Sequence, residues 1–410
     1  MISEPPTSPE TETANILDMG DGKMLGQCPS GEKIWLTGPA VPGDEVSFLR
    51  KGKGGAVLRI LREAPDRIPA PCPHFAQCPG CNLQPLPYER QCELKASKIV
   101  ETLRRIGGIK EYDWRGLTPS AEAHGTRNKL DLQVQGTQFG YTNGWELIPI
   151  EDCMLGNDAI REVLAGIRAL LTADHGIHRM MIRSDTRRDK IMVLVRGDPV
   201  TPALTEYCAN HPRITGLAQQ PEKTAAWRQL YGEPTLEMHL ADISHEIHWD
   251  QFFQVHEQQA ECLVRTAMAW LAEKPVQNVL DLFCGVGAFT LPAARLADQV
   301  LGVDSFPGQG PFLRGDLSKG LPDDIRLHRS RWDVVIMDPP RAGMEKKLCK
   351  QIRDKLKPER ILYVSCDPAT LARDLSRFCS GEVYRVERVQ GFDLFPQTTH
   401  VETLALLSRN

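Results

Sequence analysis

Cys366 is the residue of this chain whose type and position most strongly suggest chemistry. It directly follows the strand-type residues 361–365 (ILYVS) and directly precedes Asp367-Pro368. A strand that stops at Asp-Pro leaves Cys366 at its carboxyl end, which is where ligands bind in open α/β sheets. Most free cysteines are buried and structural. Cys366 is therefore a candidate nucleophile only if other functional segments accompany it.

Three such segments have the features of a cofactor site. Residues 279–287 (VLDLFCGVG) predict a strand and a glycine turn that lets the backbone approach a ligand. The turn lacks the third glycine of the G-x-G-x-x-G fingerprint and is weak alone. Residues 301–304 predict a second strand whose last carboxylate, Asp304, can hold ribose hydroxyls. Residues 332–337 predict a third strand, and the rigid rim Asp-Pro-Pro-Arg at 338–341 suits a flat substrate. With a thiol nearby, this pattern favours S-adenosylmethionine over nicotinamide and suggests covalent methyl transfer.

Three cysteines form a second constellation. Cys72, Cys78 and Cys81 have the spacing C-x5-C-x2-C in a segment rich in Pro and Gly. Short spacers bring thiolates to one point, so the segment predicts a metal-binding loop. The fourth ligand is Cys153 or one of its competitors, Cys28 and Cys92. Spacing alone does not decide between zinc and an iron–sulfur cluster.

Composition indicates a soluble protein of more than one domain. The chain has 410 residues, of which 41% are hydrophobic and 25% charged. No apolar run approaches the about 20 residues that span a bilayer. Residues 1–13 lack the basic start and apolar core of a signal peptide and predict a disordered tail. We therefore expect a cytoplasmic protein with reduced thiols.

The net charge of −4 does not exclude binding to nucleic acid, because basic residues gather at 50–67 and 95–110. Each group alone favours the interpretation as a solvated face.

The elements that must position these residues follow from local patterns. Residues 14–64 contain short alternating segments between Gly and Pro turns, which predict an OB-type barrel, a fold that often binds RNA. Residues 65–82 predict a loop, and residues 86–106 and 256–274 predict helices. From residue 278 onward, strands alternate with helices, which predicts a doubly wound parallel sheet.

Together these pieces, from about residue 14 to the end, resemble the S-adenosylmethionine-dependent RNA uracil-5-methyltransferases. The resemblance implies an α/β protein with a C-terminal class I, Rossmann-like methyltransferase domain. It also implies an OB-like TRAM barrel and a small α+β central domain that carries an iron–sulfur loop. The implied parts are a tail at 1–13, the RNA-binding TRAM domain at 14–64, the central domain at 65–83 and 116–248, and the catalytic domain at 84–115 and 249–410.

The resemblance also implies roles for particular residues. C-x5-C-x2-C followed by 71 residues and a cysteine matches the iron–sulfur branch, which implies a [4Fe–4S] cluster on Cys72, Cys78, Cys81 and Cys153. Cys366 is implied to be the nucleophile, Glu402 the base and Asp338 the carboxylate that orients the uracil. The implied contacts to S-adenosylmethionine are Gln254 (of F-F-Q-V), Phe283, Gly285, Asp304, Asp316 and Asp338.

This sequence departs from the family pattern near the cofactor. A helix that the family has after Asp304 is missing, because only residues 305–311 intervene before the next strand. Asp304 replaces the usual glutamate, and Ala288 stands where asparagine is frequent. The R-N-K sequence at 127–129 lacks the tyrosine that often precedes it. We expect the first three departures to weaken cofactor affinity.

The leading functional hypothesis is methylation of C5 of a specific uridine in 23S rRNA through a covalent Cys–C6 adduct. A TRAM domain together with a cluster resembles the ribosomal branch, and the same reaction on tRNA is the alternative. A third hypothesis is a non-catalytic iron–sulfur RNA-binding protein, against which the retained Gln254, Asp338, Cys366 and Glu402 argue. We expect a monomer without a membrane or an obligate protein partner. The cluster has no step in a redox-neutral reaction and is expected to fix a loop that contacts RNA.

Overall fold

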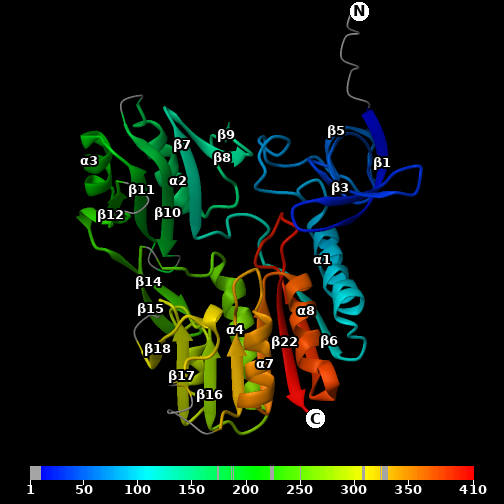
Figure 1. Ribbon diagram of the computed structural model, residues 1–410. Coiled ribbons are helices and arrows are strands. Elements are labelled where there is room, and N and C mark those ends of the chain that lie inside the picture. Colours follow the sequence, from blue (N-terminus) through cyan, green and yellow to red (C-terminus); the bar gives the residue numbers. More distant parts are fainter. Residues whose placement is uncertain are drawn as a thin grey trace, which may run out of the picture.

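The computed structural model describes residues 11–172, 175–185, 187, 189–221, 226–249, 251–306, 310–323, 325 and 331–410. Three bodies of secondary structure make up this part of the chain (Figure 1). A small barrel and a central sheet lie side by side, and a large sheet with helices lies below both (Figure 1).

The barrel is the predicted one. Its described strands close in the order β1-β2-β3-β5-β4. Alternate residues such as Ile34, Leu36 and Phe48 point inward and are buried. The bounds are β1 Thr11–Met19, β2 Met24–Gln27, β3 Lys33–Thr37, β4 Glu45–Lys51 and β5 Gly54–Arg62. Because β1 begins at Thr11, the last three residues of the predicted tail belong to the barrel. Residues 1–10 lie outside the described part.

Helix α1 (Tyr88–Thr102) follows the cysteine-rich loop and extends through a helical turn at Leu103–Gly107. The helix ends where predicted, at Gly107-Gly108, and Gly108 adopts the left-handed conformation with φ 67°. The turn packs against helix α8 (Pro368–Cys379) of the large sheet. Helix α1 therefore connects the barrel to the large sheet.

The central sheet has the strand order β13-β12-β11-β10-β7-β8-β9. Helices α2 and α3 cover one face, and Leu132, Val163 and Ile182 are among the apolar residues buried there. A separate hairpin, β14-β15, follows. The bounds are β7 Lys129–Gln135, β8 Gln138–Asn143, β9 Glu146–Pro149, α2 Asp158–Arg168, β10 Ile177–Asp185, β11 Lys190–Gly197, α3 Pro202–Asn210, β12 Ile214–Gln220, β13 Arg228–Gly232, β14 Thr235–Leu240 and β15 Ile243–His248.

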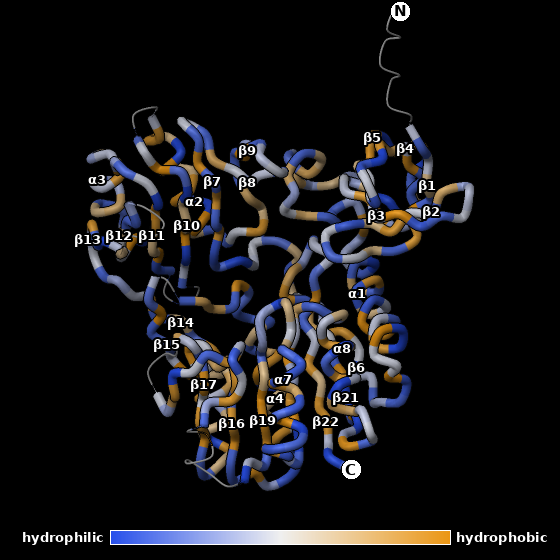
Figure 2. Tube along the Cα trace, in the orientation of Figure 1, coloured by the Kyte–Doolittle hydropathy of each residue, from blue (hydrophilic) through white to orange (hydrophobic). Residues whose placement is uncertain are grey.

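The large sheet has the order β18-β17-β16-β19-β20-β22-β21-β6. Its first five strands are parallel, as predicted, and hydrophobic residues concentrate along the middle of the sheet (Figure 2). The bounds are β6 Asp113–Thr118, α4 Glu257–Ala272, β16 Asn278–Leu282, α5 Thr290–Ala293, β17 Gln299–Asp304, β18 Phe312–Arg314, β19 Val334–Met337, α7 Lys346–Gln351, β20 Arg360–Ser365, α8 Pro368–Cys379, β21 Tyr384–Phe392 and β22 Glu402–Arg409. Further helical turns are at Leu317–Lys319, Ile352–Leu356 and Ser380–Glu382.

The rest of the large sheet departs from the prediction of a wholly parallel sheet. Strand β22 runs antiparallel to β20, and β21 antiparallel to β22. Strand β6 then pairs parallel with β21, so the boundary expected at residue 115 falls inside a strand of this sheet. The helix after the glycine turn is also only four residues long in α5. Between β17 and β18, the described residues at 305–306 and 310–311 form no helix, in agreement with the missing segment.

None of the helices in the described ranges is long and apolar enough to cross a membrane.

Candidate active site and cysteine cluster

A cavity of ≈1220 Å³ opens at the carboxyl ends of the parallel strands β16, β17, β19 and β20. Loops that leave these strand ends converge there, as is general in open α/β sheets. The cavity brings together all eight residues that the sequence assigned to catalysis or cofactor binding. They are Gln254, Phe283, Gly285, Asp304, Asp316, Asp338, Cys366 and Glu402.

One side of the cavity is built around the glycine turn after β16. Gly285 N donates to Asp304 Oδ2 at 3.1 Å, and Phe306 N donates to Asp304 Oδ1 at 2.9 Å. Both oxygens of this carboxylate are therefore fixed by backbone N–H groups. Gly287 has φ 93°, and a Cβ there would lie 2.8 Å from the Phe312 ring, so only glycine fits. This side therefore has a hydrogen-bonded carboxylate at the strand end that suits a ribose.

Cys366 and Glu402 line the other side of the cavity, at the ends of the neighbouring strands β20 and β22. Strands β20 and β22 pair antiparallel with Ser365 opposite Thr403. Continuing this register by one residue sets Cys366 opposite Glu402. Asp367 accepts hydrogen bonds from Ala369 N and Thr370 N at 2.7 and 3.1 Å and caps helix α8. Strand β20 ends at Ser365, so the thiol lies between the carboxyl end of the strand and this cap, as the sequence predicted.

The electrostatics of this side differ from the expectation of a partly ionised thiol. Burial, together with the charges of Glu402 and Asp338, raises the pKa of the Cys366 thiol to about 12, and Arg341 opposes this shift. Burial raises the pKa of Asp338 to about 7. Burial and the charge of Asp338 also raise the pKa of Glu402. Protonation of the thiol is therefore favoured, chiefly by burial, and the two carboxyl groups add to this effect against the opposing charge of Arg341.

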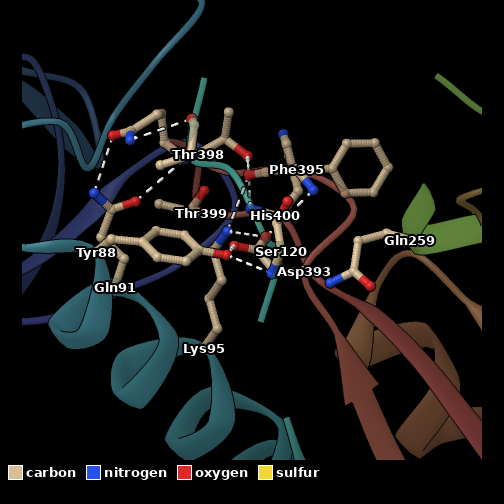
Figure 3. A network of polar contacts seen from close by, with 12 residues as sticks. Tyr88, Gln91, Lys95, Ser120, Gln259, Asp393, Phe395, Thr398, Thr399 and His400 are labelled. Carbon is tan, nitrogen blue, oxygen red and sulfur yellow. Dashed lines mark hydrogen bonds and ion pairs between the residues drawn. The ribbon is translucent and has the colours of Figure 1, made fainter. Parts of the chain in front are cut away.

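A buried polar network holds the loop between β21 and β22 (Figure 3). Lys95 Nζ of α1 donates to Asp393 Oδ1 at 2.6 Å and to Phe395 O at 2.9 Å. The side chains of Lys95 and Asp393 are both fully buried. Tyr88 Oη donates to Asp393 Oδ2 at 2.8 Å and accepts from Ser120 N at 2.7 Å. Phe395 lines the cavity, and Glu402 begins the strand after this loop, so the network fixes the geometry near Glu402.

The sequence reasoning missed this network and counted Lys95 in a basic surface group. The signal was present in the spacing of α1. Gln91, Lys95 and Ile99 are four residues apart and share the buried face of the helix. A lysine on an apolar stripe indicates a buried partner, but the partner, Asp393, is 298 positions away in the chain.

Replacing Lys95 should strongly destabilise the protein. Lys95→Ala leaves Asp393 as a buried carboxylate without its cation, and breaking such a pair costs about 3–5 kcal/mol of unfolding free energy. Urea denaturation followed by circular dichroism measures this loss. Arg105→Ala, at an exposed position of the same helical segment, should change the free energy by less than about 0.5 kcal/mol. Equal effects of the two changes would contradict the importance of the buried pair.

The four cysteines assigned to a cluster line one small pocket of ≈30 Å³. Cys72, Cys78 and Cys81 come from the loop before α1, and Cys153 comes from the turn after β9. Tyr141 Oη lies 3.9 Å from Cys153 Sγ. All twelve cysteines are free thiols, and neither competitor belongs to this pocket: Cys28 packs in the barrel core and Cys92 lies on α1. Burial raises the pKa of Cys81 to about 12 and also raises that of Cys78.

The prediction that these thiols bind a metal is not confirmed. Within the ranges that the structure describes, no group of three or more His, Cys, Asp or Glu side chains could hold a single metal ion. A [4Fe–4S] cluster makes a different demand, because its four cysteines bind separate irons. Four thiols around a shared pocket are the donor set that such a cluster uses, so the residues present fit a [4Fe–4S] cluster. The cluster itself remains a prediction.

Comparison with known proteins gives matches over nearly the whole chain. The profile of a family described as tRNA (Uracil-5-)-methyltransferase matches residues 318–410. A 23S rRNA (uracil(1939)-C(5))-methyltransferase of Pseudomonas putida is 30% identical over 426 residues, which cover 94% of this chain and 91% of the relative. An uncharacterized RNA methyltransferase of Halalkalibacterium halodurans is also 30% identical over 417 residues, or 90% of each chain.

The fold has a solved counterpart. The crystal structure of a Pyrococcus abyssi tRNA (uracil-54, C5)-methyltransferase in complex with S-adenosyl-L-homocysteine matches with a TM-score of 0.75 at 24% identity. The match covers 96% of this chain and 100% of that one. The profile match contains Asp338, Cys366 and Glu402, and the 30% identity extends through the barrel and the central sheet. On this extent of similarity, the chain belongs to the family of S-adenosylmethionine-dependent RNA uracil-5-methyltransferases.

Proposed function

We propose that this enzyme methylates C5 of a uridine in 23S rRNA through a covalent adduct between Cys366 and C6. The observation that carries the proposal is the cavity that gathers a thiol, two carboxyl groups and a cofactor-type glycine turn. The Pseudomonas putida relative, named for 23S rRNA, supports the ribosomal target. The Pyrococcus abyssi structure, named for tRNA, keeps tRNA as the second candidate.

S-adenosylmethionine would bind on the glycine-turn side and supply a methyl group from its sulfonium. Asp304 has both oxygens fixed and can still accept from ribose hydroxyls. Phe283 and Gly285 would lie against the cofactor, with Gln254 near its methionine end. Asp316 accepts from Ser318 N at 3.1 Å and pairs with Lys319 at 3.0 Å, and its carboxylate would contact the adenine side of the cofactor.

The base chemistry follows from the opposite side of the cavity. Attack of the Cys366 sulfur on C6 forms the C–S bond and moves electron density to C5, which then takes the methyl group. Glu402 removes the C5 proton, and elimination breaks the C–S bond and frees the enzyme. Asp338 would orient the uracil. The sulfonium cation of bound S-adenosylmethionine would favour ionisation of Cys366, in the same way that the positive charge of Arg341 acts to lower the pKa of the thiol.

The remaining parts receive roles in RNA binding. We assign residues 11–64 to a TRAM domain, 65–83 and 119–248 to the central domain, and 84–118 and 249–410 to the catalytic domain, because β1 begins at Thr11 and β6 belongs to the large sheet. Twelve cysteines without a disulfide fit a protein of the reducing cytoplasm, where we propose that it acts on RNA as a monomer. The target base must leave its stack to reach Cys366, so the RNA is bound at a loop or the base is flipped out.

Mapping of 5-methyluridine tests the target. Ribosomal and transfer RNA from a strain that lacks this protein are digested and analysed by mass spectrometry. We expect loss of one 5-methyluridine from 23S rRNA and its return with the gene on a plasmid. Loss from tRNA alone would support the second candidate. No loss from either RNA would support a non-catalytic RNA-binding protein.

We further propose that Cys72, Cys78, Cys81 and Cys153 hold a [4Fe–4S] cluster that fixes the loop before α1. Protein purified without oxygen should be brown and contain about four irons per chain. Cys153→Ala should lose most of the iron, whereas Cys92→Ala should retain it, because Cys92 lies outside the pocket. Metal analysis measures both variants. One zinc per chain without iron would overturn this assignment.

A further inference from the structure

A loop of the barrel reaches the rim of the active-site cavity. Gly20-Asp21-Gly22 joins β1 to β2. Gly22 N donates to Thr399 Oγ1 at 2.8 Å. Lys98 Nζ of α1 donates to Gly20 O at 3.0 Å and to Thr399 O at 2.8 Å, so one lysine ties the barrel loop to the loop after β21. The barrel is therefore attached to the segment that leads into Glu402.

The barrel itself fixes the shape of this loop. Gly22 adopts φ 64°, a conformation that favours glycine. A Cβ on Gly20 would lie 2.6 Å from the Trp35 ring of β3, so only glycine allows this ring to cover the loop. Asp21 lies between these two glycines, so the conformation of the loop determines its position.

Asp21 meets the arginine of the Asp-Pro-Pro-Arg rim. Its carboxylate pairs with Arg341 Nη2, although the two residues are 320 positions apart. Nη2 also donates to His400 Nδ1 at 3.1 Å. In the described part of the chain, the guanidinium uses no other nitrogen for a hydrogen bond, so Nε and Nη1 remain for a ligand. Figure 3 shows His400 beside Thr399 on the loop that the Lys95 network holds.

Arg341 lines the cavity together with Cys366, Asp338 and Glu402. It is the cation that opposes the two carboxyl groups at the thiol. Without a partner, an arginine side chain that is 49% exposed would sample many rotamers, and ordering it has an entropy cost. Asp21 and His400 together confine the guanidinium to the rim.

We propose that Asp21 is a positioning residue for the methyl transfer: the barrel holds Arg341 over the cavity through Asp21, so the barrel completes the active site as well as binding RNA. The proposal rests on the proposed function for its reaction. The proposal requires that replacement of Asp21 impairs catalysis. The same replacement removes a negative charge, which by itself should favour the binding of RNA, a polyanion.

The kinetic test uses Asp21→Asn in the full chain. Turnover at saturating RNA should fall about 10- to 100-fold, the range expected when a catalytic group is misplaced by about 1 Å. RNA affinity, measured by fluorescence anisotropy, should stay equal or become tighter, because a repulsive charge is lost. Asp18→Asn removes the same charge three residues away, where the side chain accepts from the neighbouring Met19 N. This control should keep wild-type turnover.

A double-mutant cycle with Arg341→Ala separates positioning from a general effect. If Asp21 acts through Arg341, Asp21→Asn should cost nothing further once Arg341 is absent. An equal cost in both backgrounds would overturn the proposal, as would wild-type or faster turnover of Asp21→Asn. Faster turnover would indicate that Asp21 restrains Arg341 rather than placing it.

A measurement without RNA keeps this test independent of the proposed function. Alkylation of Cys366 by iodoacetamide is followed against pH by mass spectrometry of its peptide. Asp21→Asn should move the alkylation profile to higher pH, since Arg341 no longer favours the thiolate, and Asp18→Asn should leave it in place. An unmoved profile for Asp21→Asn would contradict the inference even if the enzyme methylates RNA. Failure of the wild type to methylate any RNA would instead contradict the proposed function alone.

Discussion

Cys366→Ala should reduce methylation by at least about 10⁴-fold, the scale on which loss of an enzymatic nucleophile acts. The carbon C5 of uracil is too weak a nucleophile to take a methyl group until a thiolate has added to C6. Binding should change little, because the thiol acts only after RNA and cofactor are in place. Single-turnover methylation measures the loss, and calorimetry with S-adenosylhomocysteine checks that the cofactor site is intact.

A matched cysteine and a trapping substrate make this prediction specific. Cys379→Ala changes a half-buried thiol at the end of α8, the helix that follows Cys366, and should retain activity. RNA with 5-fluorouridine should trap the wild type as a covalent complex, since fluorine cannot leave as a proton does. If Cys366→Ala still forms this complex, another residue is the nucleophile and the mechanism proposed here is wrong.

The parts of the site that the sequence predicted are those encoded in short contiguous segments. Strands end at Asp304, before Asp338 and before Cys366 because each apolar run meets a carboxylate, a proline or a glycine turn. Parallel strands bring such ends to one edge of the sheet, so the residues at the strand ends are the ones expected to line the cavity. The barrel was predictable for the same local reason, because short alternating segments between tight turns fit few other folds.

What the sequence did not show depends on pairs of residues far apart in the chain. The antiparallel pairing of β22 with β20, which sets Glu402 opposite Cys366, leaves no local pattern that distinguishes it from a parallel strand. The contacts of Lys95 with Asp393 and of Asp21 with Arg341 cross about 300 positions or more. The high pKa of the Cys366 thiol is likewise a sum over Glu402, Asp338 and Arg341, which only the folded chain brings together.

This electrostatic arrangement makes the outcome at Glu402 distinctive. The charge of Glu402 raises the pKa of the Cys366 thiol, so a neutral amide at this position should make the thiol more acidic. Glu402→Gln should therefore permit thiol attack and methyl transfer but not removal of the C5 proton. This single substitution should therefore favour attack by the thiol and slow removal of the C5 proton.

With Glu402→Gln, we expect the methylated adduct to accumulate as a protein–RNA complex that survives denaturing gel electrophoresis, while turnover falls by about 10²–10⁴-fold, the usual contribution of a general base. Glu345→Gln, an exposed carboxylate at the start of α7, should show neither effect. Wild-type turnover of Glu402→Gln would mean that another group takes the C5 proton. Loss of both turnover and adduct would mean that Glu402 acts before methyl transfer. In the latter case Glu402 would be the group that accepts the proton of the thiol, since it lines the same cavity as Cys366 and its charge acts on the thiol.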